Sequence, residues 1–202
     1  GSTVKYTILE LGRRVREEGL DIVGVPTSLA TELLAKEQGI ALCELDELEG
    51  LDVVIDGTDE FDLDFQLIKG GGAALLREKI VAQSSAKMVV VADDRKKVQC
   101  LGAFPLPIEV TPFSYGTTLK AIQEKLGCEA NIRQGEDGPL VTDNGNFIID
   151  AQTGPTISNP TQTEAALLHI AGVEVGLFTN MCDVVILAGA DGVSVLEKED
   201  TS

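Results

Sequence analysis

Residues 87–93 read Lys-Met-Val-Val-Val-Ala-Asp, and this stretch decides the fold. Its central residues are apolar and mostly β-branched, which is typical of a strand buried within a parallel sheet. The stretch from Asp183 to Gly189 has the same fully buried character, and we expect it to be the last strand of the chain. Both stretches therefore predict strands of one large sheet.

Towards the N-terminus, short β-branched runs alternate with helical patterns. The expected helices cover Thr3 to Glu18, Ser28 to Gln38 and about Ala73 to Ser85, and the expected strands cover Asp21 to Pro26, Ala41 to Leu45 and Val53 to Asp56. This alternation predicts an α/β fold with a Rossmann-like, mostly parallel sheet.

The pattern changes between residues 105 and 178. The expected order is strand 108–113, helix 117–126, strand 129–134, strand 147–151, helix 161–170 and strand 173–178. That order is the split βαβ, or ferredoxin-like, arrangement, and Asp143-Asn-Gly-Asn146 has the chemistry of a tight turn. We therefore expect an α/β domain of residues 1–104 and 179–202, with a small α+β domain of residues 105–178 inserted into it.

Composition limits the function. The chain has 202 residues and a formal charge of -17, with 33 acidic residues against 16 lysines and arginines, which argues against nucleic-acid binding. Four scattered cysteines without a CxxC pair, no signal peptide and no long apolar run predict a reduced, cytoplasmic protein with no membrane segment. The single histidine, His169, argues against a histidine-based metal site or a Ser-His-Asp triad.

Candidate functional groups follow the ends of expected strands. Asp56 and Asp59 lie at the C-terminal end of the expected strand Val53 to Asp56. Lys69-Gly-Gly-Gly72 opens the helix that carries Glu78, and Arg95-Lys-Lys97 follows the strand at 87–93. Each group also has an ordinary explanation, as a turn, a flexible loop or solvated charges. Because the carboxyl ends of parallel strands meet at one edge, we expect these groups to gather there.

Gathered groups of this kind suit proton removal next to a carbonyl. A carboxylate takes the proton, a lysine stabilises the enediolate oxygen, and a second acid moves hydroxyl protons. The glycine loop and the helix after it offer N–H groups to an anionic ligand. We expect no metal and no other cofactor.

The combined motifs resemble the A-type ribose-5-phosphate isomerases. The resemblance covers almost the whole chain and rests on four motifs, with Thr58 where the family usually has Ala: Asp56-Gly-Thr-Asp-Glu60, Lys69-Gly-Gly-Gly72 with Arg77-Glu-Lys79, Phe104-Pro-Leu-Pro-Ile-Glu-Val110 and Val141-Thr-Asp-Asn-Gly-Asn146. It implies isomerisation of ribose 5-phosphate to ribulose 5-phosphate in the non-oxidative pentose phosphate pathway. It further implies that Glu78 is the general base and that Asp56, Asp59 and Lys69 assist ring opening, hydroxyl proton transfer and charge stabilisation.

The resemblance also implies binding residues and assembly. The implied substrate-binding residues are Gly1, Ser2, Thr3, Asp56, Gly57, Thr58, Asp59, Lys69, Gly70, Gly71, Gly72 and Lys96. The family pattern begins with a strand and a Gly-x-Gly-Ser-Thr loop, of which the chain shows only Gly1-Ser-Thr3, so we expect the sheet to lack a central strand and full activity to suffer. A homodimer or homotetramer is implied, formed with help from the small domain.

Three alternatives remain open at this point. Some sugar-phosphate sensor domains of transcription regulators resemble the same fold, but they would have no need of Glu78 or of both aspartates. A coenzyme A transferase, which resembles the fold distantly, would use a glutamate nucleophile on a larger substrate. Lys69 could instead form a Schiff base with the carbonyl substrate.

Overall fold

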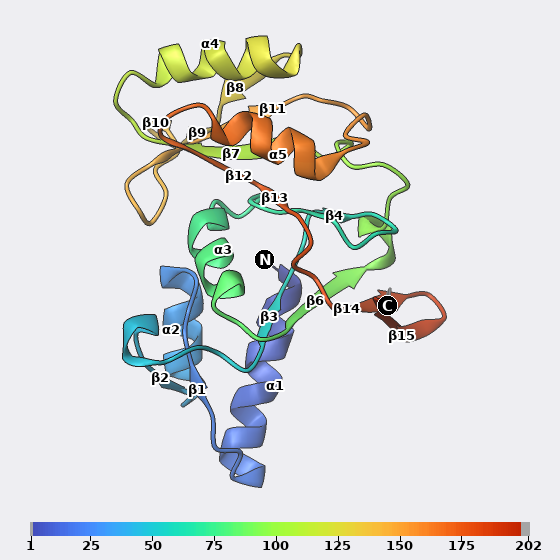
Figure 1. Ribbon diagram of the computed structural model, residues 1–202. Coiled ribbons are helices and arrows are strands. Elements are labelled where there is room, and N and C mark those ends of the chain that lie inside the picture. The colour runs from blue at the N-terminus through green and yellow to red at the C-terminus, as the bar shows by residue number, and fades with distance from the viewer. Residues whose placement is uncertain (1, 199–202) are drawn as a thin grey trace.

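The computed structural model describes residues 2–198, and it is an α/β structure with two four-stranded sheets (Figure 1). The first sheet, here called the mixed sheet, has the order β15-β14-β6-β3. Its strands are β3 (Val54–Asp56), β6 (Met88–Asp93), β14 (Val184–Gly189) and β15 (Gly192–Glu197). β3, β6 and β14 are parallel, and β15 runs antiparallel to β14.

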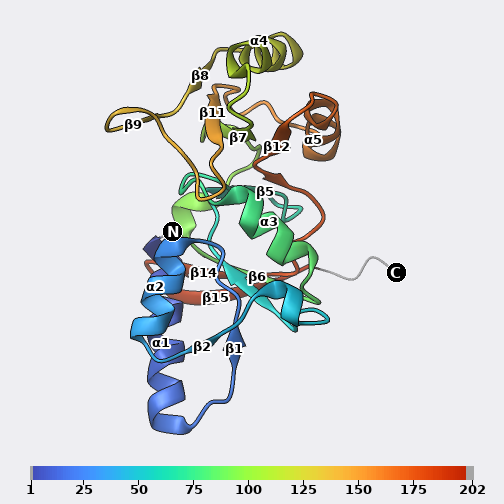
Figure 2. The ribbon, with the colours of Figure 1, turned by 90° about the vertical axis from the view of Figure 1, so that its left-hand side faces the viewer.

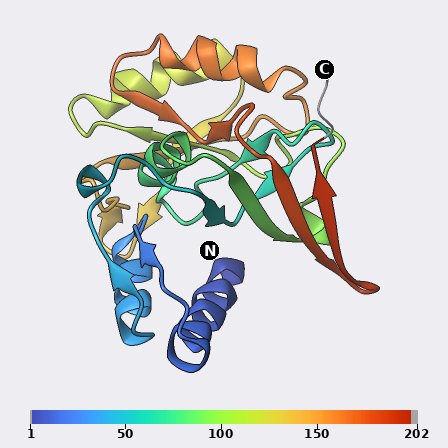
Figure 3. The ribbon, with the colours of Figure 1, turned by 60° about the horizontal axis from the view of Figure 1, so that its bottom comes forward.

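The mixed sheet confirms the expected parallel core and corrects its outer edge. Met88, Val90 and Ala92 of β6 are buried, as the apolar run at 87–93 predicts. The prediction of a last, fully buried strand at 183–189 was wrong, because β14 becomes exposed in its second half and β15 follows it. A hairpin closes between Gly189 and Gly192 and projects from one side of the molecule (Figure 3).

The N-terminal elements pack on one another beside the mixed sheet. α1 (Ser2–Glu18) and α2 (Leu29–Glu37) enclose a small apolar cluster, while β1 (Val23–Gly24) and β2 (Ala41–Leu42) form a separate parallel pair. Both strands are shorter than expected. Within residues 2–198 no strand lies between β1 and β3, and a groove of about 530 Å³ runs there, lined by Val23, Val53 and Ile55 among others.

The second sheet, here called the antiparallel sheet, has the ferredoxin-like order β12-β7-β11-β8. Its elements are β7 (Leu106–Val110), α4 (Tyr115–Leu126), β8 (Ala130–Ile132), β11 (Phe147–Ala151), α5 (Pro160–Leu168) and β12 (Val173–Val175). Apolar side chains of the two helices and the strands form one buried cluster. Figure 2 shows this sheet and its helices at the opposite end of the molecule from α1 and α2.

Two expected strands of this region have different limits. β7 ends at Val110 rather than at residue 113, because Pro112 has no N–H to continue a ladder. The expected strand 173–178 is split at Gly176 into β12 and β13 (Leu177–Phe178), which belong to different sheets. A Cβ on Gly176 would lie 2.3 Å from the carbonyl oxygen of Lys69, so only glycine fits where the chain crosses.

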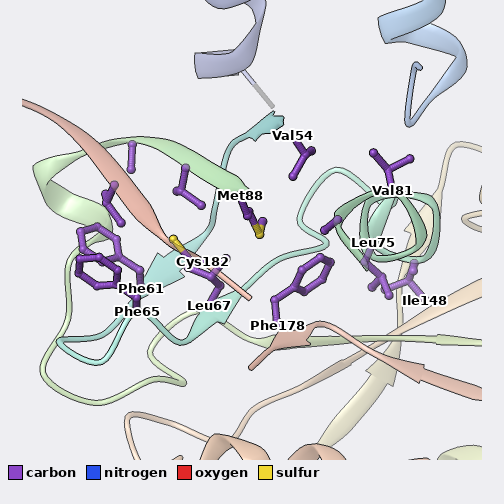
Figure 4. Packing of buried hydrophobic residues seen from close by; sticks show 14 residues of the cluster. Val54, Phe61, Phe65, Leu67, Leu75, Val81, Met88, Ile148, Phe178 and Cys182 are labelled. Atoms are coloured by element: carbon purple, nitrogen blue, oxygen red, sulfur yellow. The ribbon is translucent and has the colours of Figure 1, made fainter. Parts of the chain in front are cut away.

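A small sheet connects the two large ones. It has the order β13-β5-β4, with β4 (Glu60–Phe61) and β5 (Leu67–Ile68), and the sequence patterns did not predict these two-residue strands. The remaining elements are η1 (Leu45–Glu47), η2 (Asp94–Lys96), β9 (Gln134–Gly135), β10 (Gly138–Pro139) and α3 (Leu75–Gln83). The side chains of Leu67, Phe178 and Leu75, the last of which belongs to α3, are part of one buried apolar cluster (Figure 4). This core fixes β5 and α3, the two elements next to the glycine loop.

None of the helices within residues 2–198 combines the length and the apolar character needed to cross a bilayer.

Candidate active site

Three of the predicted residues meet around one ammonium group. Asp56 is the last residue of β3, Lys69 follows β5, and Glu78 lies in the first half of α3. The Nζ atom of Lys69 lies 3.0 Å from Oδ2 of Asp56 and 3.3 Å from Oε2 of Glu78. It also donates a hydrogen bond to the carbonyl oxygen of Gly57. The strand ends and the helix start therefore assemble the cluster that the sequence predicts.

Burial makes this cluster electrostatically unusual. The side chains of Lys69, Asp56 and Glu78 are 3%, 9% and 12% exposed. Burial raises the pKa of Glu78, the charge of Lys69 opposes this, and the charge of Asp56 adds to it. Burial alone would lower the pKa of Lys69, but the charges of Asp56 and Glu78 outweigh it and hold that pKa above its usual value. The lysine is therefore a cation, and Glu78 binds a proton more readily than an exposed glutamate.

Two carboxylate oxygens of the cluster have the Lys69 ammonium group as their only polar partner among the described residues. Within residues 2–198, Oδ2 of Asp56 and Oε2 of Glu78 are buried and have no hydrogen-bond partner, although both lie near Lys69. A carboxylate oxygen can accept more than one hydrogen bond, so each of these atoms keeps acceptor capacity for a donor of a ligand. Asp56, Glu78 and Gly72 all line the groove between β1 and β3.

The glycine loop holds the second aspartate. The N–H group of Gly71 donates to Oδ2 of Asp59 at 2.7 Å. A Cβ on Gly71 would lie 2.6 Å from the other carboxylate oxygen of Asp59. Gly70 has a φ of +112° and lies against Leu75, so its conformation also requires glycine. The triplet thus brings a backbone N–H group next to an acid.

Thr58 and Gly57 support the turn between the aspartates. The Thr58 hydroxyl lies 2.7 Å from the carbonyl oxygen of Glu60 and 2.9 Å from that of Ile68, so it ties the turn to β5. The N–H of Gly57 donates to Oδ1 of Asp56 at 2.7 Å. These contacts leave Oδ2 as the oxygen of Asp56 that faces Lys69.

The structure does not bring every predicted residue to the cluster. Gly1 lies outside the described residues, and Ser2 and Thr3 begin helix α1 instead of extending a loop. Lys96 is half-buried in η2, and it makes no hydrogen bond or ion pair with Asp56, Lys69 or Glu78. Their binding roles therefore stay predictions.

The patterns missed the function of Lys79, the neighbour of Glu78. Its ammonium group is buried and donates to Glu164 at 2.7 Å, to Glu174 at 2.6 Å and to the carbonyl oxygen of Val175. A signal was present, because Lys79 falls on the same helical stripe as the buried Leu75. A lysine on a buried stripe needs partners from another element.

No group of three or more histidine, cysteine, aspartate or glutamate side chains in the described ranges has the geometry to hold a metal ion.

Comparison with known proteins gives a consistent result. The family model described as Ribose 5-phosphate isomerase A (phosphoriboisomerase A) matches residues 23–192. Ribose-5-phosphate isomerase A of Bacillus mycoides strain KBAB4 is 52% identical over 194 residues, which cover 96% of this chain and 87% of that protein.

Two solved structures that are similar to this chain are also ribose 5-phosphate isomerases. The structure of a D-ribose-5-phosphate isomerase in complex with phospho-erythronic acid has 42% sequence identity and a TM-score of 0.94, over 98% of this chain and 87% of that one. Ribose 5-phosphate isomerase A from Methanocaldococcus jannaschii has 42% identity and a TM-score of 0.92, over 98% and 88% of the two chains.

Proposed function

The chain belongs to the ribose 5-phosphate isomerase A family and is an aldose–ketose isomerase, and on this premise we propose that Glu78 is its general base. The observation that carries the proposal is the buried Oε2 atom of Glu78, which lies 3.3 Å from the Lys69 ammonium group and has no other polar partner within residues 2–198. A carboxylate that has lost its water and has a raised pKa is a stronger base than an exposed one.

The reaction needs one proton to move between neighbouring carbons. Glu78 removes the proton from C2 of open-chain ribose 5-phosphate, and the electron pair of that bond forms the C1–C2 double bond of an enediolate. The negative charge develops on the O1 oxygen, and the Lys69 ammonium group stabilises it. Glu78 then returns the proton to C1, which completes ribulose 5-phosphate.

A hydroxyl proton must also move from O2 to O1. Asp56 and Asp59 are proposed to handle this proton and to assist opening of the sugar ring. Their placement supports this assignment, since Oδ2 of Asp56 keeps acceptor capacity beside the Lys69 ammonium group and Asp59 is held by the N–H of Gly71. Both acids keep a defined orientation while a substrate hydroxyl exchanges protons with them.

The Schiff-base alternative for Lys69 has less support. An imine forms from a neutral amine, but Lys69 lies between two carboxylates that raise its pKa. Its Nζ atom also donates to the carbonyl oxygen of Gly57. Charge stabilisation therefore fits Lys69 better than covalent chemistry.

We propose that the substrate lies along the glycine loop. Gly57, Thr58, Gly70, Gly71 and Gly72 would line the bound substrate, and Lys96 would contact it. Gly1, Ser2 and Thr3 are also proposed to bind the substrate, and only the likeness to the family supports their role. Phospho-erythronic acid, bound by the solved relative, carries a planar carboxylate that resembles an enediolate, so we expect this chain to bind it as well.

We also make proposals about the oligomeric state of the protein, its cellular compartment and its division into domains. We infer a homodimer or homotetramer in the cytoplasm from the family, and four free cysteines are compatible with a reducing compartment. We further propose that residues 1–104 and 179–202 form the catalytic domain and residues 105–178 the small one. The separate antiparallel sheet supports that division.

Isotope transfer in deuterated water tests the function. The chain is incubated with ribose 5-phosphate, and ribulose 5-phosphate and deuterium at C1 are followed by NMR. Product that carries solvent deuterium is the expected result. Phospho-erythronic acid binding without product or exchange would contradict the mechanism and point to a binding protein.

A further inference from the structure

One arginine connects the antiparallel sheet to the glycine loop. Arg133 follows β8, and its Nη1 atom lies 2.9 Å from the carbonyl oxygen of Gly70 and 3.1 Å from that of Gly71. One guanidinium nitrogen thus donates to two successive peptides of the loop that joins Lys69 to α3. No other described side chain donates to these two carbonyls.

The guanidinium group of Arg133 is held in place by Asp150. Its Nε and Nη2 atoms donate to the two carboxylate oxygens of Asp150, at 2.8 and 2.6 Å. Asp150 belongs to β11, and the two side chains are only 16% and 22% exposed. A two-point arginine–carboxylate pair defines the plane of the guanidinium group, so the third nitrogen has a fixed direction.

Because a peptide is planar, fixing its carbonyl group also fixes the direction of its N–H group. In a trans peptide the C=O and the N–H point to opposite sides. The Gly70 carbonyl shares its peptide with the N–H of Gly71, which donates to Asp59. The Gly71 carbonyl shares its peptide with the N–H of Gly72, a residue that lines the groove with Asp56 and Glu78. Holding both carbonyls therefore aims both N–H groups away from Arg133.

The loop depends on an outside constraint of this kind. Three successive glycines have no side chains to restrict the backbone, and glycine loses more conformational freedom on ordering than any other residue. The loop's own turn supplies one bond, from the N–H of Ala73 to the carbonyl of Gly70. Arg133 adds two more from a rigid sheet.

We propose that Arg133 is a positioning residue for the isomerisation, which holds the Gly70–Gly71 and Gly71–Gly72 peptides so that one N–H orients Asp59 and the other faces the substrate. This inference rests on the proposed function. The antiparallel sheet then takes part in catalysis. Asp150 orients the guanidinium group of Arg133, and Arg133 in turn orients the peptides of the glycine loop next to the reacting groups.

Arg133→Lys tests the proposal, because lysine keeps the charge but cannot bind Asp150 at two points and also reach both carbonyls. We expect kcat for ribose 5-phosphate to fall about 10- to 100-fold, which is typical of a misplacement of about 1 Å, while KM changes less than about threefold. Arg16→Lys is the matched control, since Arg16 also binds a backbone carbonyl, that of Gln38, far from the cluster. It should leave kcat unchanged.

A double-mutant cycle with Asp59→Asn separates positioning from general destabilisation. If Arg133 acts through the loop, Arg133→Lys should lower kcat much less when Asp59 is already lost, because residues of one network are not additive. Asp150→Asn provides a second, milder variant with the same expected pattern, in case Arg133→Lys does not fold. The amide NMR signals of Gly71 and Gly72 should shift in both variants.

The outcomes are distinguishable. A wild-type chain that isomerises while Arg133→Lys and Asp150→Asn keep full kcat would overturn the role of Arg133 alone. Fully additive losses with Asp59→Asn would overturn the action of Arg133 through Asp59. A wild-type chain that shows neither product nor deuterium exchange would overturn the proposed function, and this inference with it.

Discussion

The Nζ atom of Lys79 lies 2.6 Å from Oε1 of Glu174, and this ion pair ties α3 to β12 of the antiparallel sheet. Lys79 is the direct neighbour of Glu78, so the residue after the proposed base is anchored in another layer of the molecule. Arg77, on the other side, donates to the side chain of Asn144 at 2.8 Å. Helix α3 is therefore held through both neighbours of Glu78.

Loss of the Lys79 ammonium group should destabilise the protein strongly. Lys79→Met leaves Glu164 and Glu174 without their buried partner, which typically lowers the free energy of unfolding by about 3–5 kcal/mol. Urea denaturation measures this change. Lys36→Met is the control, because Lys36 is 60% exposed and its pair with Glu32 contributes less than about 0.5 kcal/mol. Equal losses in the two variants would contradict the prediction.

Glu78→Gln should abolish most activity without loss of fold. The amide keeps the size of the side chain but cannot accept the C2 proton, so kcat should fall by at least about 100-fold. The deuterium assay described above measures it, with circular dichroism as the control for folding. Substantial remaining exchange at C1 would show that another residue is the base.

The pH dependence of stability should identify the buried carboxylate. Because burial raises the pKa of Glu78, the folded protein holds this proton more tightly than the unfolded chain does. The contribution of Glu78 to stability is therefore largest below pH 4.5 and falls as pH rises through the raised pKa. Glu78→Gln should raise the melting temperature at pH 8, and the gain should shrink towards pH 4. A gain of equal size at both pH values would contradict this cause.

The raised pKa of Glu78 should also determine how activity decreases at low pH. Glu78 must be ionised to act as a base, so kcat/KM should decrease as pH falls through its raised pKa. The midpoint should therefore lie above 4.5, the ordinary value for a glutamate. A rate that stays constant down to pH 4.5 would argue that the pKa of the base is not raised.

Gly71→Ala should disturb Asp59 directly. The new Cβ would lie 2.6 Å from Oδ1 of Asp59, so the carboxylate or the loop must move, and kcat should fall roughly 10- to 100-fold. Steady-state kinetics on ribose 5-phosphate measures the loss. Gly116→Ala is the matched control, since a Cβ there has no heavy atom within 4 Å and Gly116 lies in α4. That variant should keep its activity and gain about 0.5–1 kcal/mol of stability.

Borohydride reduction in the presence of substrate should leave Lys69 unmodified. Its pKa is held above the usual value by Asp56 and Glu78, which keeps the amine protonated and unreactive towards the carbonyl. Mass spectrometry of the peptide that contains Lys69 measures the outcome. A pentitol phosphate adduct on this residue would replace the enediolate scheme with an imine.

Much of the fold could be predicted because its signals are local. The apolar run at 87–93 and the helical pattern at 117–126 predict β6 and most of α4 without knowledge of any partner. The two-residue strands β4 and β5 could not be predicted, since they exist only through pairing with each other and with β13. The break at Gly176 depends on how closely Lys69 approaches it, which is likewise a tertiary property.

The same distinction applies to the site. Asp56, Lys69 and Glu78 could be grouped from the sequence because each follows a strand end or opens a helix. The burial of Glu78 could not, because a glutamate in a helix is usually solvated and its cover comes from other elements. Arg133 gave no signal at all, as its partners Gly70 and Asp150 lie 63 and 17 residues away.

The strand that carries Asp56 is also the least secured part of the mixed sheet. β3 has three residues and, within residues 2–198, its ladder runs along β6 only, while its other edge faces the groove. Local opening is easiest where few backbone bonds must break, so the amides of β3 should exchange with solvent faster than those of the central β6. A ligand that binds Asp56 in the folded protein should slow this exchange, because binding to the folded state alone adds to its stability.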